Sequence, residues 1–481
     1  VGRRDGRLDA APRGPRTRPA AHAACDAHRL ARRGLRSRAP HDSRPAVEAS
    51  PALVYVGVMK TLLMLGGSPH QVHAIRRAVA MGLRVVTCDD RPDNPGHVFA
   101  HEYHEVSTTD LDGVLALAGR VGIDGVLAYA SDPAALTAAY VADRLGLPGD
   151  PLGAVRRAQD KLRLREVQAA ADLPVPEFVD AADRDAVRRL RQGHPDGIVV
   201  KPTDASGSRG VTVVPADASG ADADAAVATA LAASRSGRAV AEAFWGQGRP
   251  EHAGDALVVD GRIHYLGLLA KLLRQRPGAM PEPVGGGPPL FGPVESDAIR
   301  GQVQVLVDAL GLRNGAYNFD LRVDGDGRFT IIDFGARMGG TLVGLLYEAR
   351  DGIDLVGACI DLAIGVRRVP RATEPGSGHL SILRIQADRD GAFRELRLSK
   401  ELAGMVIASQ LAVQSGQAVR AYRDSGDLVG IMVLRSTDPG ILSTIAMDPQ
   451  RFFTVVMVGD AVLESDSHPF LLDDALSRPG P

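Results

Sequence analysis

From Met59 onward, short apolar runs alternate with longer stretches in which apolar residues recur at helical spacing. Runs of four or five apolar residues are typical of buried strands, and apolar positions three and four residues apart are typical of amphipathic helices. Strands are therefore expected at Leu62–Leu65, Arg84–Cys88, Tyr103–Val106 and Gly125–Tyr129, and helices at Gln71–Met81 and Leu111–Val121. This alternation predicts a parallel sheet covered on both faces, which is a Rossmann-like domain over residues 59–150.

After residue 150 the alternation becomes less regular. Residues 151–175 have helical spacing, with Lys161 inside the expected helix, and the prolines at 174 and 176 end it. Further strands are expected at Ile198–Val200, Val211–Val214, Val240–Phe244, Ala256–Val259, Arg262–Tyr265, Ala316–Val323 and Phe329–Phe334, and helices at Ala223–Ser234 and Ser296–Leu310. Asp260-Gly261 predicts a tight hairpin, Asp324–Gly327 joins a second strand pair, and the glycine- and proline-rich stretch Arg276–Gly292 is expected to be a mobile loop.

The end of the chain has mostly strand patterns, including Leu428–Leu434. The expected fold class is therefore α/β and α+β: the Rossmann-like domain, a larger domain over residues 151–368, and a smaller strand-rich α+β domain over residues 369–470, followed by a tail at 471–481. A chain of 481 residues has room for about three domains.

The first 58 residues differ from the rest in charge. They hold 12 arginines against 5 acidic residues and have no apolar periodicity, whereas the remainder has 44 Lys and Arg against 53 Asp and Glu. We expect a disordered extension that is not native, with Met59 as the true first residue; the alternative is a basic arm for nucleic acid or a membrane. Because the remainder is mildly acidic, no nucleic-acid partner is expected.

Cysteine usage and hydropathy indicate the compartment. Cys25, Cys88 and Cys359 form neither a CxxC nor a CxxH pattern, which argues against a disulfide framework and a zinc site and favours a reducing cytoplasm. No apolar run is long enough to span a membrane, so no membrane partner is expected.

Lysine is scarce in this chain: of 56 basic residues, the lysines are Lys60, Lys161, Lys201, Lys271 and Lys400. Lys201 follows a β-branched strand and precedes a loop of small residues, Ser206-Gly207-Ser208-Arg209-Gly210-Val211. A compact ammonium followed by unobstructed backbone N–H groups is what a phosphate-binding loop requires. The alternative is retention by chance, which we prefer for Lys60 and Lys400; for Lys271 a place on a surface helix is preferred to a phosphate contact.

Two aspartates are expected to approach each other across the second hairpin. Asp320 lies on one strand and Asp333 near the end of the other. Paired carboxylates repel unless a proton or metal lies between them, and Mg²⁺ binds through few carboxylates plus phosphate oxygens. Arg337 could stabilise a transferred phosphoryl group, Asn318 could add a metal ligand, and Arg322 could hold a substrate carboxylate, since both share the face of Asp320. The alternative is two solvated aspartates with Arg337 as their surface partner.

A second glycine-rich turn, Gly66-Gly67-Ser68, precedes the first expected helix and could bind a phosphate of a dinucleotide. Its GxGxxG pattern is incomplete, and Asp89-Asp90 matches a ribose-binding acid only loosely. An NAD-dependent enzyme is therefore an alternative, and we expect instead a Rossmann-like domain that helps to frame another substrate.

The Lys201 loop and the aspartate pair together resemble the ATP-grasp superfamily of carboxylate–amine ligases, over about residues 59–365. The resemblance implies that residues 151–368 form an ATP-grasp domain, that Asp320 and Asp333 hold magnesium, and that residues 130–133 line the side facing the ATP module. The segment from Glu242 to Trp245 would frame the adenine. The nucleotide-binding residues it implies are Lys161, Lys201, Ser206, Gly207, Ser208, Gly210, Val211, Glu242, Ala243, Phe244, Trp245 and Asp255.

The chain departs from the family pattern after the second acid. Gly335 stands where asparagine is usual, so that one metal ligand is missing or replaced by water, and Ala336 replaces a proline. Both acids are aspartate where glutamate is common, which shortens their reach by one methylene. The change at Gly335 weakens a two-metal site more than it weakens ATP binding.

The implied activity is an ATP-dependent carbon–nitrogen ligation through an acyl phosphate, with ADP and phosphate as products. Lys201, Arg322 and Arg337 would be catalytic, ATP and Mg²⁺ (or Mn²⁺ in its place) the cofactors, and a small carboxylate such as an amino acid and an amine the substrates. A homodimer is the default expectation. The alternatives are an ATP-grasp enzyme of purine or carbamoyl-phosphate-type metabolism, a nucleotide-binding protein without catalysis, and the NAD-dependent enzyme.

Overall fold

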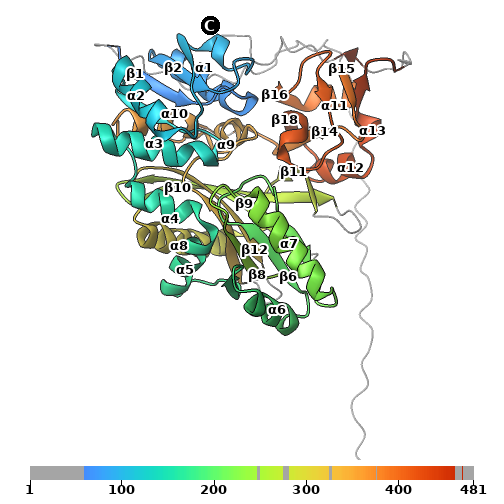
Figure 1. Cartoon of the computed structure of the whole chain (residues 1–481). Helices are drawn as coiled ribbons and strands as arrows, with labels where there is room; N and C mark the ends of the chain where they lie inside the picture. Colours follow the sequence, from blue (N-terminus) through green and yellow to red (C-terminus); the bar gives the residue numbers. More distant parts are fainter. Residues whose placement is uncertain are drawn as a thin grey trace, which may run out of the picture. The chain divides into compact units, whose positions relative to one another are not determined.

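A computed structural model describes residues 59–245, 250–274, 281–323, 328–374 and 376–460, together with the backbone of His468–Pro469. The extension 1–58, the tail and the turn at Asp324–Gly327 lie outside the described residues. Four parallel strands open the described chain, in the order β3-β2-β1-β4. They are β1 (Thr61–Leu65), β2 (Arg84–Asp89), β3 (Glu102–Glu105) and β4 (Gly125–Leu127). The predicted parallel, Rossmann-like sheet is confirmed (Figure 1).

The helices of this first sheet begin and end at residues suited to helix termini. Asp110 caps α2 by accepting from the N–H of Gly113 at 3.0 Å, and Gly122 ends it with a left-handed φ of 69°. The helices are α1 (Pro69–Ala80), α2 (Leu111–Val121) and α3 (Asp132–Leu145), with short 3₁₀ turns at His97–Phe99 here and Ser425–Asp427 later in the chain.

The single helix predicted over residues 151–175 is wrong, because the structure divides it into α4 (Leu152–Gln159) and α5 (Lys161–Ala170). Asp160 causes the break: its carboxylate accepts from the N–H groups of Leu162 and Arg163 at 3.0 and 3.2 Å and caps α5. Lys161 is therefore the first residue of α5 rather than an interior one, and its N–H donates to the carbonyl of Thr203 at 2.8 Å.

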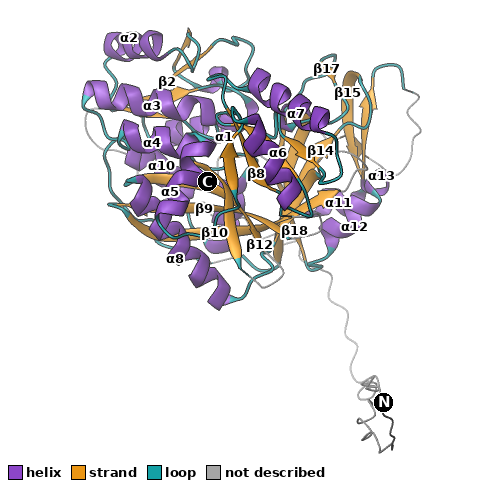
Figure 2. Cartoon of the chain, turned by 60° about the horizontal axis from the view of Figure 1, so that its bottom comes forward, coloured by secondary structure: helices purple, strands orange, loops and turns teal. Residues whose placement is uncertain are grey.

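A small antiparallel sheet follows, in the order β5-β8-β6-β7. It contains β5 (Phe178–Asp180), β6 (Ile198–Pro202), β7 (Thr212–Val214) and β8 (Ala239–Ala243). Two helices pack against it, α6 (Arg184–Gly193) and α7 (Gly220–Ala233), and Figure 2 shows both beside β8. Ser219 and Asp222 form a capping box at the start of α7, which fixes where this helix begins.

The largest sheet has eight antiparallel strands in the order β13-β12-β9-β10-β11-β14-β18-β16. Its first five strands are β9 (Glu251–Val259), β10 (Arg262–Arg274), β11 (Glu282–Gly287), β12 (Gly315–Val323) and β13 (Phe329–Gly335). Asp260 and Gly261 join β9 to β10 with φ values of 51° and 81°, as the predicted tight turn requires. Helix α8 (Pro293–Leu310) packs on β10 and on α4 and α5.

The loop predicted over residues 276–292 is wrong for residues 282–287, which form β11 between β10 and β14; residues 275–280 lie outside the described part. Glycine permits this strand because its neighbours approach closely: a Cβ on Gly285 would lie 2.4 Å from the carbonyl oxygen of Ile382.

The chain then returns to the first sheet before it builds the C-terminal part. Helix α9 (Val343–Asp351) is followed by α10 (Leu355–Ala363), which contacts α1 and β4. The remaining elements are β14 (His379–Gln386), β15 (Gly391–Leu398), α11 (Lys400–Met405), β16 (Val406–Leu411), β17 (Ala418–Val419), β18 (Leu428–Ser436), α12 (Ile441–Met447), α13 (Pro449–Phe452), β19 (Phe453–Met457) and β20 (His468–Pro469). Because the large sheet continues through β14, β18 and β16, the boundary at residue 368 stays a prediction. No helix in the described part of the chain has the length and apolarity needed to cross a membrane.

Candidate active site

A cavity of about 130 Å³ lies where the small sheet faces β12 and β13 of the large sheet. The sequence predicted most of its wall: the predicted nucleotide-binding residues that line it are Lys161, Lys201, Ser206, Gly207, Ser208, Val211, Glu242, Ala243, Phe244 and Trp245. Asp320, Asp333 and Arg322 also line it. The glycine loop and the acid pair, which are more than 100 residues apart in the chain, therefore meet at one cavity.

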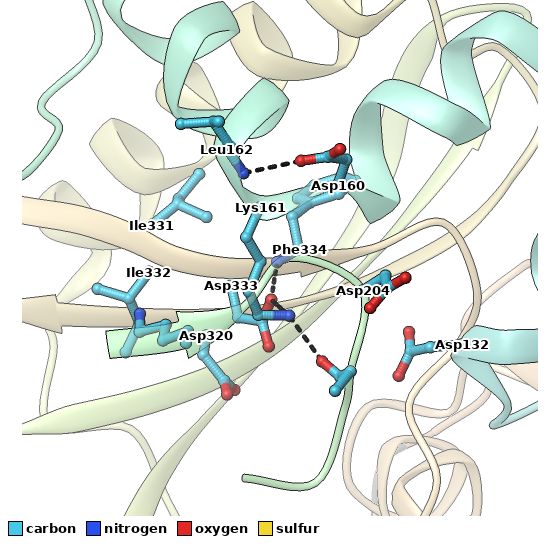
Figure 3. A network of polar contacts seen from close by, with 12 residues as sticks. Asp132, Asp160, Lys161, Leu162, Asp204, Asp320, Ile331, Ile332, Asp333 and Phe334 are labelled. Atoms are coloured by element: carbon cyan, nitrogen blue, oxygen red, sulfur yellow. Dashed lines mark hydrogen bonds and ion pairs between the residues drawn. The ribbon is translucent and has the colours of Figure 1, made fainter. Parts of the chain in front are cut away.

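A smaller cavity of about 30 Å³ adjoins the first and shares Lys161, Asp320 and Asp333 with it. It adds Asn318, Gly335, Arg337 and, from the first domain, Asp132. Figure 3 shows Lys161 pointing from the start of α5 toward Asp333, with Asp320 on one side and Asp132 and Asp204 on the other. The structure thus brings together the residues predicted to act on the phosphates.

Lys201 has a counterion that the sequence did not reveal. Its Nζ lies 2.8 Å from Oε2 of Glu242, and Nε of the fully buried Arg165 lies 3.0 Å from Oε1 of the same carboxylate. Burial lowers the pKa of Lys201, although the charge of Glu242 opposes this effect. The role of Glu242 in framing the adenine stays a prediction, and its buried carboxylate is already held by two cations.

Lys161 links the acid pair to the glycine loop. Its Nζ lies 3.1 Å from Oδ1 of Asp333 and donates to the carbonyl of Ala205 at 3.0 Å (Figure 3). The break at Asp160 makes this contact possible, because it places Lys161 at a helix start beside the cavity.

Asp320 and Asp333 are direct partners across the β12–β13 hairpin, and each is bound by a different lysine. Asp320 Oδ2 lies 2.6 Å from Nζ of Lys271. Burial raises the pKa of Asp320 despite this lysine. Burial also acts to raise the pKa of Asp333, but Lys161 and Lys201 outweigh it and lower that pKa to about 2. Asp333 is therefore the acid that stays ionised at any working pH.

Lys271 was misplaced by the sequence analysis: it lies on β10 and not on a surface helix. Besides Asp320, its Nζ contacts Oε1 of Glu251 at 2.7 Å, and Nη2 of Arg322 lies 3.0 Å from the other oxygen of that carboxylate. No sequence pattern pointed to Glu251. Lys271, in contrast, is one of only five lysines in the chain, and this scarcity was a signal for a functional role.

Arg322 lines the same cavity as Asp320, so the shared face was predicted correctly. Its guanidinium is bound to Glu251 and lies over the ring of Phe244, with 5.3 Å between Cζ and the ring centroid. Its role in holding a substrate carboxylate stays a prediction, and such a role would require Arg322 to share its bonds with Glu251.

Gly210 and Asp255 were expected to contact the nucleotide, but neither lines the cavity. A Cβ on Gly210 would lie 2.4 Å from the Cβ of Ala233, so this glycine serves close packing against α7. Asp255 is fully buried and accepts from the N–H of Gly339 at 2.6 Å and the hydroxyl of Tyr347 at 3.2 Å. Asp255 therefore fixes the segment that follows Arg337.

The donor set around the acid pair fits magnesium. Asp320, Asp333 and Asn318 present oxygen atoms to the smaller cavity, and Nδ2 of Asn318 donates to the carbonyl of Gly254 at 3.0 Å, which leaves the amide oxygen as the atom for an ion. Within the described ranges no three His, Cys, Asp or Glu side chains form a metal cluster.

Within the turn Gly66-Gly67-Ser68, Gly67 is not available to a dinucleotide phosphate. The N–H of Gly67 already donates to Oδ2 of Asp89 at 3.1 Å, and a Cβ on Gly67 would lie 2.1 Å from the ring of His97. Asp89, the loosely matched ribose acid, also accepts from Nδ2 of Asn94 at 2.9 Å. These contacts argue against an NAD site at this turn.

Solved structures share this arrangement of domains. The L-amino acid ligase from Bacillus licheniformis superposes with a TM-score of 0.68 at 21% identity, covering 83% of this chain and 98% of that chain. Phosphoribosylglycinamide synthetase from Anaerococcus prevotii gives a TM-score of 0.65 at 16% identity, covering 83% and 99%. The chain has the ATP-grasp fold. The biotin carboxylase domain of the 2-oxoglutarate carboxylase from Hydrogenobacter thermophilus, solved with MgADP and bicarbonate, shares this fold at a TM-score of 0.66 and 16% identity, covering 82% and 91%.

Sequence comparison adds less than structure. No protein-family model matches this chain. The uncharacterized protein y4rH from Sinorhizobium fredii (strain NBRC 101917 / NGR234) is 26% identical over 352 residues, which is 69% of each protein.

Proposed function

We propose that this protein is an ATP-dependent ligase that joins a small carboxylate, such as an amino acid, to an amine. The carboxylate would attack the γ-phosphate of ATP to give an acyl phosphate and ADP, and the amine would then displace phosphate to form an amide. The observation that carries the proposal is the single cavity where Lys161, Lys201 and the glycine loop face Asp320 and Asp333.

The side chains of the cavity suit positioning and charge stabilisation. Lys161 and Lys201 would pair with phosphate oxygens, and each now neutralises a carboxylate, Asp333 and Glu242 respectively. Asp320, Asp333 and Asn318 would hold Mg²⁺, which supplies charge neutralisation between the phosphates when bound. Arg337 would stabilise the phosphoryl group during transfer.

The loop after Lys201 would cover the phosphates. Gly207 and Ser208 are exposed and have left-handed φ values of 67° and 63°, so successive backbone N–H groups can converge on an anion. Closure of such a loop would keep water from the acyl phosphate. The carboxylate substrate is itself the nucleophile, so the reaction needs no protein nucleophile.

The experiment is ADP and phosphate release with Mg-ATP against a library of amino acids and other small acids, alone and with amines. We expect ADP release that depends on one acid and one amine, and its loss in Asp333→Asn with the melting temperature retained. Stabilisation of the protein by NAD but not by Mg-ATP would refute the proposal. Binding of ATP without ADP release across the whole panel would favour a nucleotide-binding protein without catalysis.

A further inference from the structure

Asp132 reaches the ATP module from the first domain. Its carboxylate accepts two hydrogen bonds from Arg337, from Nε at 2.8 Å and from Nη2 at 2.5 Å. A two-point contact of this kind fixes the plane of a guanidinium as well as its position. The side chains of Arg337 and Asp132 are 15% and 22% exposed, so water competes only weakly for these bonds.

The backbone before Asp132 is shaped to deliver it. Ala130, three residues after the end of β4, has a left-handed φ of 53°, a conformation that non-glycine residues rarely adopt. Asp132 then begins α3, and Nε2 of Gln159 donates to its carbonyl oxygen. Gln159 ends α4 in the second domain. Residues of the second domain therefore bind both the main chain of Asp132, through Gln159, and its side chain, through Arg337.

The carboxylate of Asp132 occupies the space between Gly335 and Arg337. A Cβ at position 335 would lie 2.7 Å from Oδ1 of Asp132 and 3.4 Å from both Cζ and Nε of Arg337. The φ of Gly335 is not in the left-handed region, so its backbone does not demand glycine. A side chain at position 335 would therefore displace the Asp132 carboxylate from its present place beside Arg337.

We propose that Asp132 is a positioning residue that holds Arg337 in register with the acid pair, so that the phosphoryl-transfer site is complete only when the first domain is docked. This inference rests on the proposed function, because it concerns the same Arg337. It also explains Gly335: the anchor of the arginine comes from another domain instead of from β13, the strand that ends two residues before the arginine.

The charges around Arg337 agree with a fixed cation. Burial acts to lower the pKa of Arg337, but the charge and hydrogen bonds of Asp132 outweigh it and raise the pKa above its usual value. Asp255 and Asp333 add in the same direction. Carboxylates from three elements therefore favour the charged form of Arg337, and Asp132 is the one that accepts two hydrogen bonds from its guanidinium.

The test exchanges the two positions. Asp132→Ala should lower kcat by about 10²-fold, the usual effect of a misplaced catalytic group, while the KM for ATP changes by less than about threefold. The exchange variant Asp132→Gly with Gly335→Asp returns a carboxylate to the same space from β13 and should recover at least about tenfold of the lost kcat. Gly335→Asp alone should be the least stable variant, because its side chain meets Asp132. Melting temperature is recorded for every variant.

The outcomes separate this inference from the proposed function. If the wild-type protein releases no ADP with any substrate pair, the proposed function fails first. If it is active and Asp132→Ala matches or exceeds it, Arg337 needs no anchor and the inference is overturned. A folded exchange variant no better than Asp132→Ala also overturns it. Should the exchange variant not fold, Asp132→Asn decides: it keeps the shape and removes the charge, and full activity in it would reject the inference.

Discussion

Two glycine-rich turns in this chain look alike in sequence, and the structure gives them opposite surroundings. The turn Gly66-Gly67-Ser68 follows β1, and the loop Ser206-Gly207-Ser208 follows β6. At the first turn, His97 fills the space over Gly67 and Asp89 accepts its N–H. The second loop is exposed at Gly207 and Ser208 and lines the cavity of about 130 Å³.

The difference arises from residues that lie outside the turns themselves. His97 and Asp89 close the first turn from later parts of the same domain, 22 residues or more along the chain. Lys201 lies just ahead of the second loop, and Lys161 approaches it from α5. A glycine turn therefore becomes a phosphate site when cations and open space surround it, and a packing site when side chains cover it.

Removing a cation beside the second loop should have the largest effect on turnover, and Lys201 is that cation. We expect Lys201→Met to reduce ATP-dependent turnover by about 10²–10³-fold, since removing one preorganised charge from a phosphoryl-transfer site is of this order. The fold should survive because Arg165 still neutralises Glu242. The measurement is ADP release with saturating Mg-ATP, together with the melting temperature.

Lys400→Met is the matched control for this prediction. Lys400 begins α11, is exposed and lies outside both cavities. Turnover in the control should stay within about twofold of wild type. Equal losses of turnover in the two variants would show that removing a lysine acts through general stability. The proposed difference between the loop after Lys201 and the turn at Gly67 would then be unsupported.

The sequence predicted the four strands and the first two helices of the first domain because their signals are local, but it did not predict α3. Strand length, helical spacing and a capping aspartate such as Asp110 depend on neighbours in the chain. Two failures have different causes, the first a set of distant contacts and the second a local cap. β11 exists because β10 and β14 lie on both sides of its glycines, and the break before Lys161 follows from the cap made by Asp160, which helical spacing alone does not register.

The site divides in the same way. Lys201, Asp320 and Asp333 stand beside recognisable strands and turns, so the sequence could propose them. Arg165 and Glu251 could not be proposed, because each owes its place to a partner far along the chain: Arg165 to Glu242, and Glu251 to Lys271. Burial of paired charges is a tertiary property with no local pattern.

A glycine-to-alanine substitution in each turn should have smaller effects than Lys201→Met, and different ones in the two turns. Gly67→Ala places a Cβ 2.1 Å from the ring of His97, so we expect a loss of stability of about 1–3 kcal/mol from overpacking. Gly207→Ala puts a side chain at a φ of 67° in an exposed loop that can relax, so we expect a KM for ATP raised about tenfold and a nearly unchanged melting temperature.

Thermal unfolding and ATP titrations of the two alanine variants measure these effects. Gly67→Ala should lose stability and keep its KM for ATP, whereas Gly207→Ala should keep its stability and have a raised KM for ATP. A raised KM for ATP in Gly67→Ala, without loss of stability, would contradict the description of the first turn as a packing site.

The smallest expected effect is a difference in pH dependence. Burial lowers the pKa of His97 below its usual value of 6.5, and it lowers the pKa values of His70 and His73 on α1 to about 4. The unfolded chain therefore binds more protons than the folded one below pH 6.5, so stability should fall progressively as the pH drops from 6.5 toward 4. The KM for ATP should change little from pH 8 to 6, because Asp333, with a pKa of about 2, stays ionised. His97→Gln should flatten the stability profile just below pH 6.5, where only the unfolded chain binds a proton at His97. A profile as steep as that of wild type in this range would show that the closed turn does not depend on a neutral His97.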